Sequence, residues 1–260
     1  MQICDGSNSS WTGITCENNL VTGINLNLNF ISGTIPSELG GLLSLTSLQI
    51  YENRISGTIP SSIGQLTNLV VLELYWNLLT GTIPESIGYL TSLQSLKLFT
   101  NSLQGTIPTL LGGLTQLTWL DISANSLTGT IPNEIGDLHA IEVMNIGENP
   151  YQGVLPTSFG KLTNLKFLAI DGTLLTGSIP TALCNDVALT SLYLQYQDSS
   201  NFTCYPNCLS SVPDLFVGST PVCAYHPSAG IRAGTLTCCI SGSIIFIYHP
   251  SLCTKSLGVL

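Results

Sequence analysis

Histidines and cysteines are the residues of this 260-residue chain best suited to catalysis or metal binding. Acid-base or nucleophilic catalysis needs a base held beside a nucleophile, and His139, His226 and His249 lie in no motif that would supply one. His139 directly follows Leu138 and is interpreted as a solvated surface residue. We therefore expect no catalytic residues and no enzymatic activity.

A group of soft ligands lies near the C-terminus. Cys238, Cys239, His249 and Cys253 could supply four metal ligands, yet adjacent cysteines rarely face one ion, and the chain has no Cys-x-x-Cys pair. We interpret these cysteines as disulfide-bonded or as free thiols. The sequence therefore predicts no metal site and no cofactor.

The charge balance excludes one class of partner. Six Lys and Arg residues against fifteen Asp and Glu residues give a formal net charge of -9, which opposes binding to phosphate backbones. Nucleic acid is not expected as a partner. Hydrophobic residues make up 44% of the chain, which is enough for a substantial core.

The nine cysteines lie towards the two ends of the chain, and they favour an oxidising compartment. Two sequons point the same way, so we expect glycosylation at Asn8 and Asn201 and an extracellular or cell-surface location. Residues 1–3 are too short to hold an export segment before Cys4, and we interpret the chain as a truncated or processed gene product.

A repeat of 24 residues organises the middle of the chain. Gly-Thr-Ile-Pro or a close variant begins at each step, at Gly33, Gly57, Gly81, Gly105, Gly129, Gly153 and Gly177. An asparagine stands four residues before each glycine, except where Thr173 interrupts the column. This column consists of Asn29, Asn53, Asn77, Asn101, Asn125 and Asn149.

The repeat predicts short strands and short 3₁₀ segments. Leu72 and Leu74 alternate with Glu73 and Tyr75, which is the period of a strand. Apolar residues spaced by three or four positions follow each proline and suit a 3₁₀ segment. One coil cannot bury its leucines alone, so the coils must stack, with eight strands of a parallel sheet between residues 24 and 194. The asparagine amides would then bind backbone groups of neighbouring turns as a ladder.

The repeat Leu-x-x-Leu-x-Leu-x-x-Asn-x-Leu-x-Gly-x-Ile-Pro-x-x-Ile/Leu-Gly-x-Leu resembles the plant-type leucine-rich repeat of receptor-like proteins and receptor kinases over residues 21–197. The resemblance implies an α/β solenoid, a right-handed superhelix with a concave parallel sheet and convex 3₁₀ segments. It also implies a second short strand holding Thr58, Thr82, Thr106 and Thr130.

The ends resemble disulfide caps of the same family. Trp11-Thr-Gly13-Ile-Thr-Cys16 resembles its N-terminal cap, which implies a bridge from Cys4 to Cys16. Four later cysteines allow three pairings, of which proximity along the chain favours Cys184 with Cys204 and Cys208 with Cys223. The expected domains are a cap at 1–20, a solenoid at 21–197, a second cap at 198–223 and an atypical tail at 224–260.

The tail fits no repeat. Residues 233–254 carry no formal charge but contain too many hydroxyl groups for a typical membrane-spanning helix. We expect a disordered or non-native end, and membrane association only through a missing or weak C-terminal segment.

Strand positions that flank the buried leucines are free to serve a ligand. Aromatic and charged residues gather there, and exposed Tyr and Trp dominate binding hot spots. Glu73 and Asp121 would lie two coils apart, about 10 Å, so we interpret them as recognition charges rather than an acid-base pair. The expected concave patch consists of Tyr51, Glu52, Glu73, Tyr75, Trp76, Lys97, Phe99, Trp119 and Asp121.

The resemblance implies a non-catalytic extracellular recognition module in perception or defence signalling. The acidic border of the concave patch would suit a peptide or protein that carries Lys or Arg, and the rings of the patch would equally suit a glycan. A co-receptor is a further expected partner. The alternative is a soluble secreted inhibitor or a wall-associated protein, similar to polygalacturonase inhibitors, which would occlude an extracellular polysaccharide-degrading enzyme.

Overall fold

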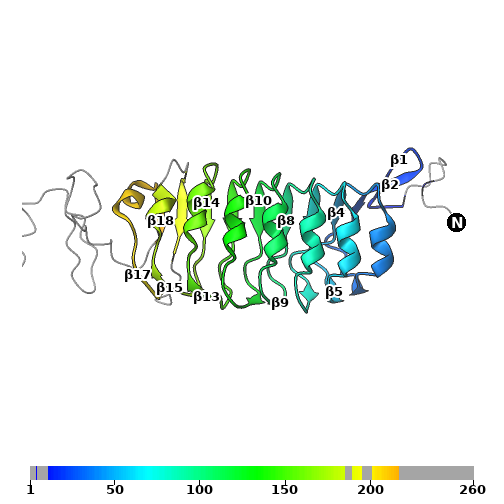
Figure 1. Cartoon of the computed structure of the whole chain (residues 1–260). Coiled ribbons are helices and arrows are strands. Elements are labelled where there is room, and N and C mark those ends of the chain that lie inside the picture. Colours follow the sequence, from blue (N-terminus) through cyan, green and yellow to red (C-terminus); the bar gives the residue numbers. More distant parts are fainter. Residues whose placement is uncertain (1–3, 5–10, 185–188, 195–200, 217–260) are drawn as a thin grey trace, which may run out of the picture.

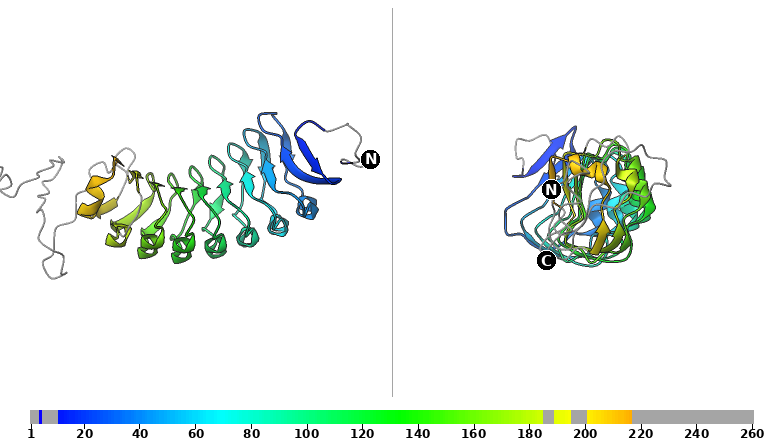
Figure 2. Two further views of the ribbon diagram at one scale, coloured as in Figure 1. Left: turned by 90° about the horizontal axis from the view of Figure 1, so that it is seen from above. Right: turned by 90° about the vertical axis from the view of Figure 1, so that its left-hand side faces the viewer.

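The computed structural model describes residues 4, 11–184, 189–194 and 201–216. The sequon at Asn8, Cys223 and the tail at 224–260 lie outside the described residues, as do the side chains of Asn201 and Cys204. The described part is a curved solenoid, with strands on the inner side of the curve and 3₁₀ segments on the outer side (Figures 1 and 2). The predicted fold class is therefore confirmed.

A ten-stranded sheet runs along the concave side. Its first two strands, β1 (Ile14–Glu17) and β2 (Leu20–Asn25), pair antiparallel, and every later pair is parallel. The later strands of this sheet are β4 (Ser47–Gln49), β6 (Val71–Glu73), β8 (Ser95–Lys97), β10 (Trp119–Asp121), β12 (Val143–Asn145), β14 (Phe167–Ala169), β16 (Ser191–Tyr193) and β18 (Asp214–Phe216).

Short 3₁₀ segments line the convex side, most of them directly after a proline, whose fixed φ and missing N–H suit the start of a helical turn. A Cβ atom at Gly64 would collide with the carbonyl oxygen of Ser86 in the next coil, so only glycine permits this stacking distance. The segments are η1 (Ser37–Gly41), η2 (Ser61–Gln65), η3 (Glu85–Tyr89), η4 (Thr109–Gly113), η5 (Asn133–Asp137), η6 (Thr157–Lys161), η7 (Thr181–Cys184) and η8 (Asn207–Ser211).

Three small parallel sheets form a lateral side, with strand orders β3-β5-β7, β9-β11 and β13-β15-β17. Thr58, Thr106 and Thr130 lie after these strands rather than in them, and Thr82 makes only an isolated bridge to Gln104. The prediction was wrong for these four threonines because β5, β7, β9 and β11 each end at or before the positive-φ glycine that precedes the threonine. The strands are β3 (Ser32–Thr34), β5 (Arg54–Gly57), β7 (Leu78–Leu79), β9 (Gln104–Gly105), β11 (Ser126–Leu127), β13 (Gln152–Val154), β15 (Leu174–Ser178) and β17 (Asn201–Cys204).

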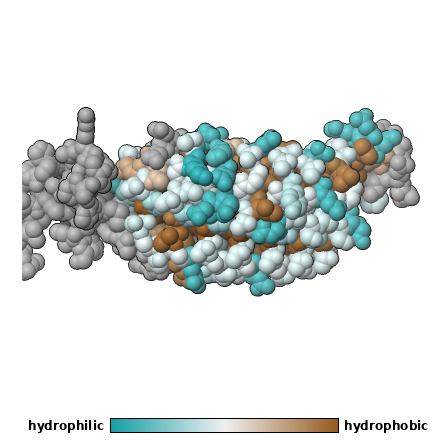
Figure 3. Space-filling view, in the orientation of Figure 1, coloured by the Kyte–Doolittle hydropathy of each residue, from teal (hydrophilic) through white to brown (hydrophobic). Residues whose placement is uncertain are grey.

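The core is one continuous column of leucine and isoleucine side chains. Leu72 pairs in register with Leu48 on one side and Leu96 on the other, and none of the three has exposed surface. The convex face, turned to the viewer in Figure 3, is mostly white and teal with scattered brown patches. Burial therefore occurs between coils, and the convex face remains of intermediate to hydrophilic character over most of its area although the chain has few charges.

The asparagines stack between neighbouring coils. The Asn149 side chain is 1% exposed; its Oδ1 accepts the Leu127 N–H at 3.0 Å, and its Nδ2 donates to the Ile122 and Gly147 carbonyls at 3.0 and 2.9 Å. Asn53, Asn77, Asn101 and Asn125 repeat this pattern. Where Thr173 interrupts the column, its hydroxyl donates to the Ile170 carbonyl, and the Tyr151 N–H uses the Asn149 carbonyl instead. The exposed Asn29 side chain donates to the Asn27 carbonyl.

Two disulfides lie near the ends of the described solenoid. Cys4 is bonded to Cys16. Cys184 is bonded to Cys208, which contradicts both predicted pairings, Cys184 with Cys204 and Cys208 with Cys223. The physical reason is the stacking of the 3₁₀ segments: Cys184 is the fourth residue of η7 and Cys208 is the second residue of η8, with Cα atoms 5.9 Å apart. In earlier coils the fourth position of one segment faces the second position of the next in the same way, as Gly64 faces Ser86. The domain boundaries given above stay predictions.

We expect Asn149→Ala to lower the free energy of unfolding by about 3 kcal/mol, because it leaves buried backbone N–H and carbonyl groups without partners. Denaturant titration measures the change. Asn164→Ala is the matched control, since the exposed Asn164 makes a single bond to the His139 carbonyl. Equal effects of the two substitutions would contradict the role of the ladder.

We expect Cys184→Ser combined with Cys208→Ser to lower the free energy of unfolding by about 3 kcal/mol, because the bridge closes a 24-residue loop. Denaturant titration with and without reductant measures it, and reductant should lower the stability of the variant less than that of the parent. If the denaturant concentration at the unfolding midpoint is the same in the variant and the parent, the bridge does not stabilise the fold.

Candidate ligand-binding surface

Parallel pairing in register places equivalent positions of successive coils side by side. Val71 pairs with Ser47 and Ser95, and Glu73 pairs with Gln49 and Lys97. Neighbouring strands in a sheet are about 4.8 Å apart, so side chains on one face form continuous columns. The leucine between each such pair is buried, which leaves the flanking columns on the concave face.

Three predicted ring residues form a stacked aromatic row, defined as Tyr51, Tyr75 and Phe99. The Tyr51 and Tyr75 centroids are 4.4 Å apart with planes 9° from parallel, and Tyr75 and Phe99 repeat this geometry. Burial, followed by the neighbouring Tyr51 and Glu73, raises the pKa of Tyr75 above its usual value of 10.0. Tyr75 therefore contributes a neutral hydroxyl at physiological pH.

A polar row runs beside the stacked aromatic row. Asn25 Nδ2 donates to Gln49 Oε1 at 3.3 Å, and Gln49 Nε2 donates to Glu73 Oε2 at 2.9 Å. Lys97 Nζ lies 3.0 Å from Glu73 Oε1 and 4.6 Å from the centroid of the Trp119 ring. Glu73, expected as a free recognition charge, is only 8% exposed and is already engaged by its neighbours.

Asp121, the second predicted recognition charge on the concave strands, has no ion-pair partner among the described residues. It accepts the Ser123 N–H and hydroxyl at 3.1 and 2.6 Å, and Asn145 Nδ2 approaches at 3.4 Å. Burial raises the pKa of Asp121 above its usual 3.8, although these hydrogen bonds and Lys97 act in the opposite direction. Asp121 is therefore a partly desolvated carboxylate on the concave face that no ion pair among the described residues neutralises.

Glu52 and Trp76 do not belong to the concave strands. Both follow a strand in left-handed backbone, with φ of 54° and 53°, and both line a recess of about 390 Å³ on the lateral side. We call this the lateral recess, lined by Leu28, Phe30, Glu52, Asn53, Arg54 and Trp76. The nine predicted patch residues thus divide between two surfaces.

Sequence reasoning missed a second ring cluster on the concave sheet. The Phe167 and Tyr193 centroids lie 5.4 Å apart, and Tyr193 stacks on Phe216 at 4.5 Å and 11°. Phe167 directly precedes the buried Leu168, so its place on the concave face follows from the 24-residue period. The step from Leu192 to its partner Leu215 is 23 residues rather than 24, and this change of period hid Phe216.

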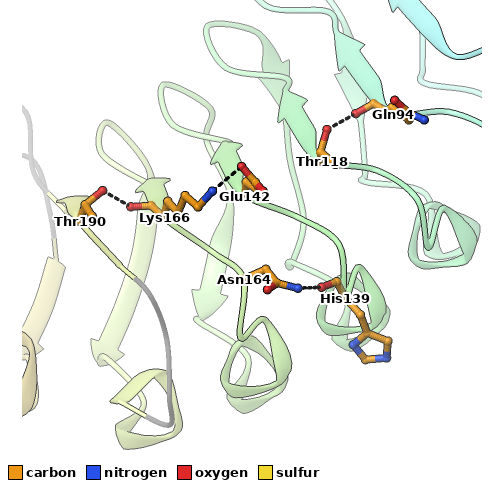
Figure 4. A network of polar contacts seen from close by, with 7 residues as sticks. All are labelled: Gln94, Thr118, His139, Glu142, Asn164, Lys166 and Thr190. Atoms are coloured by element: carbon orange, nitrogen blue, oxygen red, sulfur yellow. Dashed lines mark hydrogen bonds and ion pairs between the residues drawn. The ribbon is translucent and has the colours of Figure 1, made fainter.

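His139 is an exposed residue that follows η5 on the convex side. In Figure 4 its ring points away from the other labelled side chains. Its carbonyl accepts a hydrogen bond from Asn164 Nδ2 at 2.8 Å, and its N–H donates to the Asp137 carbonyl at 2.9 Å. The neighbouring ion pair joins Lys166 Nζ to Glu142 Oε2 at 2.7 Å, with both side chains about half exposed. Within the part of the chain that the structure describes, no three His, Cys, Asp or Glu side chains converge on a metal position.

Among the described residues, no helix has the length and apolar character needed to cross a bilayer.

Comparisons with known proteins agree with this architecture. The family model for a leucine-rich repeat region matches residues 24–129. Among curated proteins, none matches the chain. Solved structures similar to the chain include the ectodomain of the Arabidopsis receptor kinase HAESA in complex with an IDA peptide hormone ligand, with 28% identity and a TM-score of 0.66.

Two further similar structures are the plant peptide hormone receptor RGFR1 in complex with RGF2, with 33% identity and a TM-score of 0.57, and PEPR1–AtPEP1, with 26% identity and a TM-score of 0.57. The matches to HAESA, RGFR1 and PEPR1 cover 77%, 71% and 82% of this chain. They cover 38%, 33% and 39% of the receptor chains, so the chain spans a little over a third of their length.

We expect Asp121→Asn to gain stability relative to the parent as pH rises from about 4 to 7. The folded state holds the Asp121 proton more tightly than the unfolded chain, so the stability of the protonated form is lost as pH rises through the raised pKa. Melting temperatures of both proteins at the two pH values measure the difference.

Asp137→Asn is the control of opposite sign. The hydrogen bond from Lys161 lowers the pKa of the exposed Asp137, so the stability that its charge contributes is lost as pH falls. A pH-independent difference between Asp121→Asn and the parent would show that Asp121 ionises normally.

Proposed function

Because this chain is a leucine-rich repeat protein of the plant type, we propose that it is a non-catalytic recognition module that binds a peptide or protein segment on its concave face. The observation that carries the proposal is the combination of stacked rings and an unpaired carboxylate on neighbouring coils of one open sheet. Solvated aromatic clusters are costly unless a partner covers them.

The geometry of the rings favours a peptide over a glycan. Sugars stack on open ring faces, whereas Tyr51, Tyr75 and Phe99 cover one another's faces at 4.4 Å. Lys97 occupies one face of Trp119. What remains is a row of ring edges and hydroxyl groups, which suits an extended peptide with apolar side chains.

The electrostatics indicate which charged side chain the ligand carries. Lys97 is held by Glu73, so it has little capacity left for an anionic ligand group. Asp121 has no ion-pair partner among the described residues and is partly desolvated, so a Lys or Arg side chain would lower the cost of its charge. We therefore propose a peptide or protein segment with a basic residue next to an apolar one.

The solved complexes of HAESA with IDA and of RGFR1 with RGF2 support a peptide ligand for this fold. Disulfides at both ends of the described solenoid support an oxidising environment. We propose an extracellular or cell-surface location and a role in perception or defence signalling together with a co-receptor.

A soluble inhibitor of a polysaccharide-degrading enzyme is the second candidate. The cluster of Phe167, Tyr193 and Phe216 favours it, because two ring clusters on one face suit a broad protein surface better than one short peptide. Inhibition of a secreted polygalacturonase by the purified chain, lost on Phe216→Ala, would favour this candidate.

We expect Tyr75→Ala combined with Trp119→Ala to weaken ligand binding more than tenfold, because both rings lie at the centre of the concave face. Twelve-residue peptides selected from a random phage-displayed library on the parent protein serve as the probe. The melting temperature should stay within about 3 °C, because the leucine core is untouched.

Tyr89→Ala is the matched control, since Tyr89 is a 57% exposed ring on the convex η3. Selected peptides that bind the double variant as tightly as the parent would place the binding site elsewhere. A failure to select any peptide, together with enzyme inhibition, would favour the second candidate.

A further inference from the structure

The lateral recess lies outside the concave sheet. It is formed where three successive coils leave β2, β4 and β6 and enter β3, β5 and β7. Trp76 and Leu28 occupy the position before the ladder asparagine, and Phe30 and Arg54 occupy the position after it. Leu78 takes this second position in the next coil.

Later coils show that the solenoid does not need large side chains at these two positions. Where the first coils have Leu28 and Trp76, the fourth and fifth have Thr100 and Ala124. Where the first coils have Phe30, Arg54 and Leu78, these two coils have serine, Ser102 and Ser126. The repeat thus provides an internal comparison, in which bulk and charge at the recess are additions to the common structure.

Neither burial nor backbone preference accounts for the large residues. Phe30 is 78% exposed, Leu28 61%, Leu78 57% and Trp76 54%. Leu28, Phe30 and Trp76 also adopt φ values between 53° and 58°, a left-handed conformation that bulky residues seldom occupy. Gly172 fills the Trp76 position of a later coil at φ 63° without that strain. A contiguous exposed apolar patch of this kind typically marks an interaction site.

Arg54 supplies the positive charge of the recess, and Glu52, with which it forms no ion pair, supplies a negative one. The Arg54 backbone is fixed by the N–H bond to the Ile31 carbonyl at 2.8 Å and by the pairing of β5 with β3 and β7. The guanidinium lies 5.7 Å from the centroid of the Phe30 ring and forms no ion pair with any residue that the structure describes. An arginine held on an aromatic ring keeps its donors available for a carboxylate.

We propose that the lateral recess docks a segment of a partner protein in which an apolar side chain stands next to an acidic residue. The apolar side chain lies against Trp76, Leu28 and Phe30, and the carboxylate pairs with Arg54. This partner chemistry is the opposite of that proposed for the concave face, where Asp121 calls for a basic residue. The chain therefore carries two recognition surfaces of different charge preference.

The test uses nuclear magnetic resonance, because the chain has three tryptophans and two of them report on separate surfaces. A synthetic twelve-residue peptide with Phe beside Asp is titrated into the full chain labelled with ¹⁵N. We expect the indole signal of Trp76 to shift while that of Trp119 stays in place. Peptides with Ser for Phe, or Lys for Asp, should bind at least tenfold more weakly.

Variants assign the binding to named residues. Trp76→Asn and Phe30→Ser should each weaken the Phe–Asp peptide at least tenfold, and neither is expected to unfold the chain, because Phe30 is largely exposed and asparagine tolerates positive φ. Arg54→Gln should remove the preference for Asp over Lys while keeping that for Phe over Ser. Thr100→Asn, in the same column, and the concave double variant should bind as the parent does.

Three results would overturn the proposal. The first is an unshifted Trp76 signal at millimolar peptide, or equal binding by Trp76→Asn. The second is sedimentation with phosphatidylcholine vesicles that depends on Trp76, which would make the recess a membrane contact. The third is self-association of the parent that Phe30→Ser abolishes, which would make a second copy the occupant. If the concave double variant still binds the selected peptides as tightly as the parent, the proposal for the concave face is wrong, and the proposal for the lateral recess is unaffected.

Discussion

A coil of 24 residues cannot bury its own leucines, and this constraint determines the rest of the structure. Leu72 is completely buried only because Leu48 and Leu96 lie beside it in neighbouring coils. Hydrophobic contact has no direction and cannot by itself fix the phase of the coils. Hydrogen bonds do have direction, and Asn149 reaches backbone groups of its own coil and of the preceding one. The leucines thus supply the stability and the asparagines supply the register.

The register then decides what the surfaces can present. Equivalent positions of successive coils lie about one strand spacing apart, so rings at Tyr51, Tyr75 and Phe99 are brought face to face whatever their purpose. The same register closes those ring faces to a ligand and leaves only their edges. The same rule applies to charges. Glu73 lies between Gln49 and Lys97, and its carboxylate accepts a hydrogen bond from Gln49 and forms an ion pair with Lys97.

The period predicts the strands, the 3₁₀ segments and the concave columns, because each is repeated in phase and each repeat supports the others. Contacts that depend on side-chain length were not predictable in this way. The columns predict that Lys97 lies next to Glu73, but they do not predict that the two side chains form an ion pair. The Cys184–Cys208 bridge was missed because the pairing was predicted from proximity along the chain, whereas the contact between stacked 3₁₀ segments decides it. The shortened last coil hid Phe216, since it breaks the period on which the columns were read.

The asparagine ladder also limits how such a protein can change in length during evolution. Each ladder amide serves its own coil and the one before it, so duplication or loss of a whole coil leaves every remaining amide with the same kind of neighbour. Insertion of a single residue within a strand would turn the remaining side chains of that strand to the other face. Tandem duplication within the gene is therefore the genetic event that can lengthen the recognition surface without disturbing the fold.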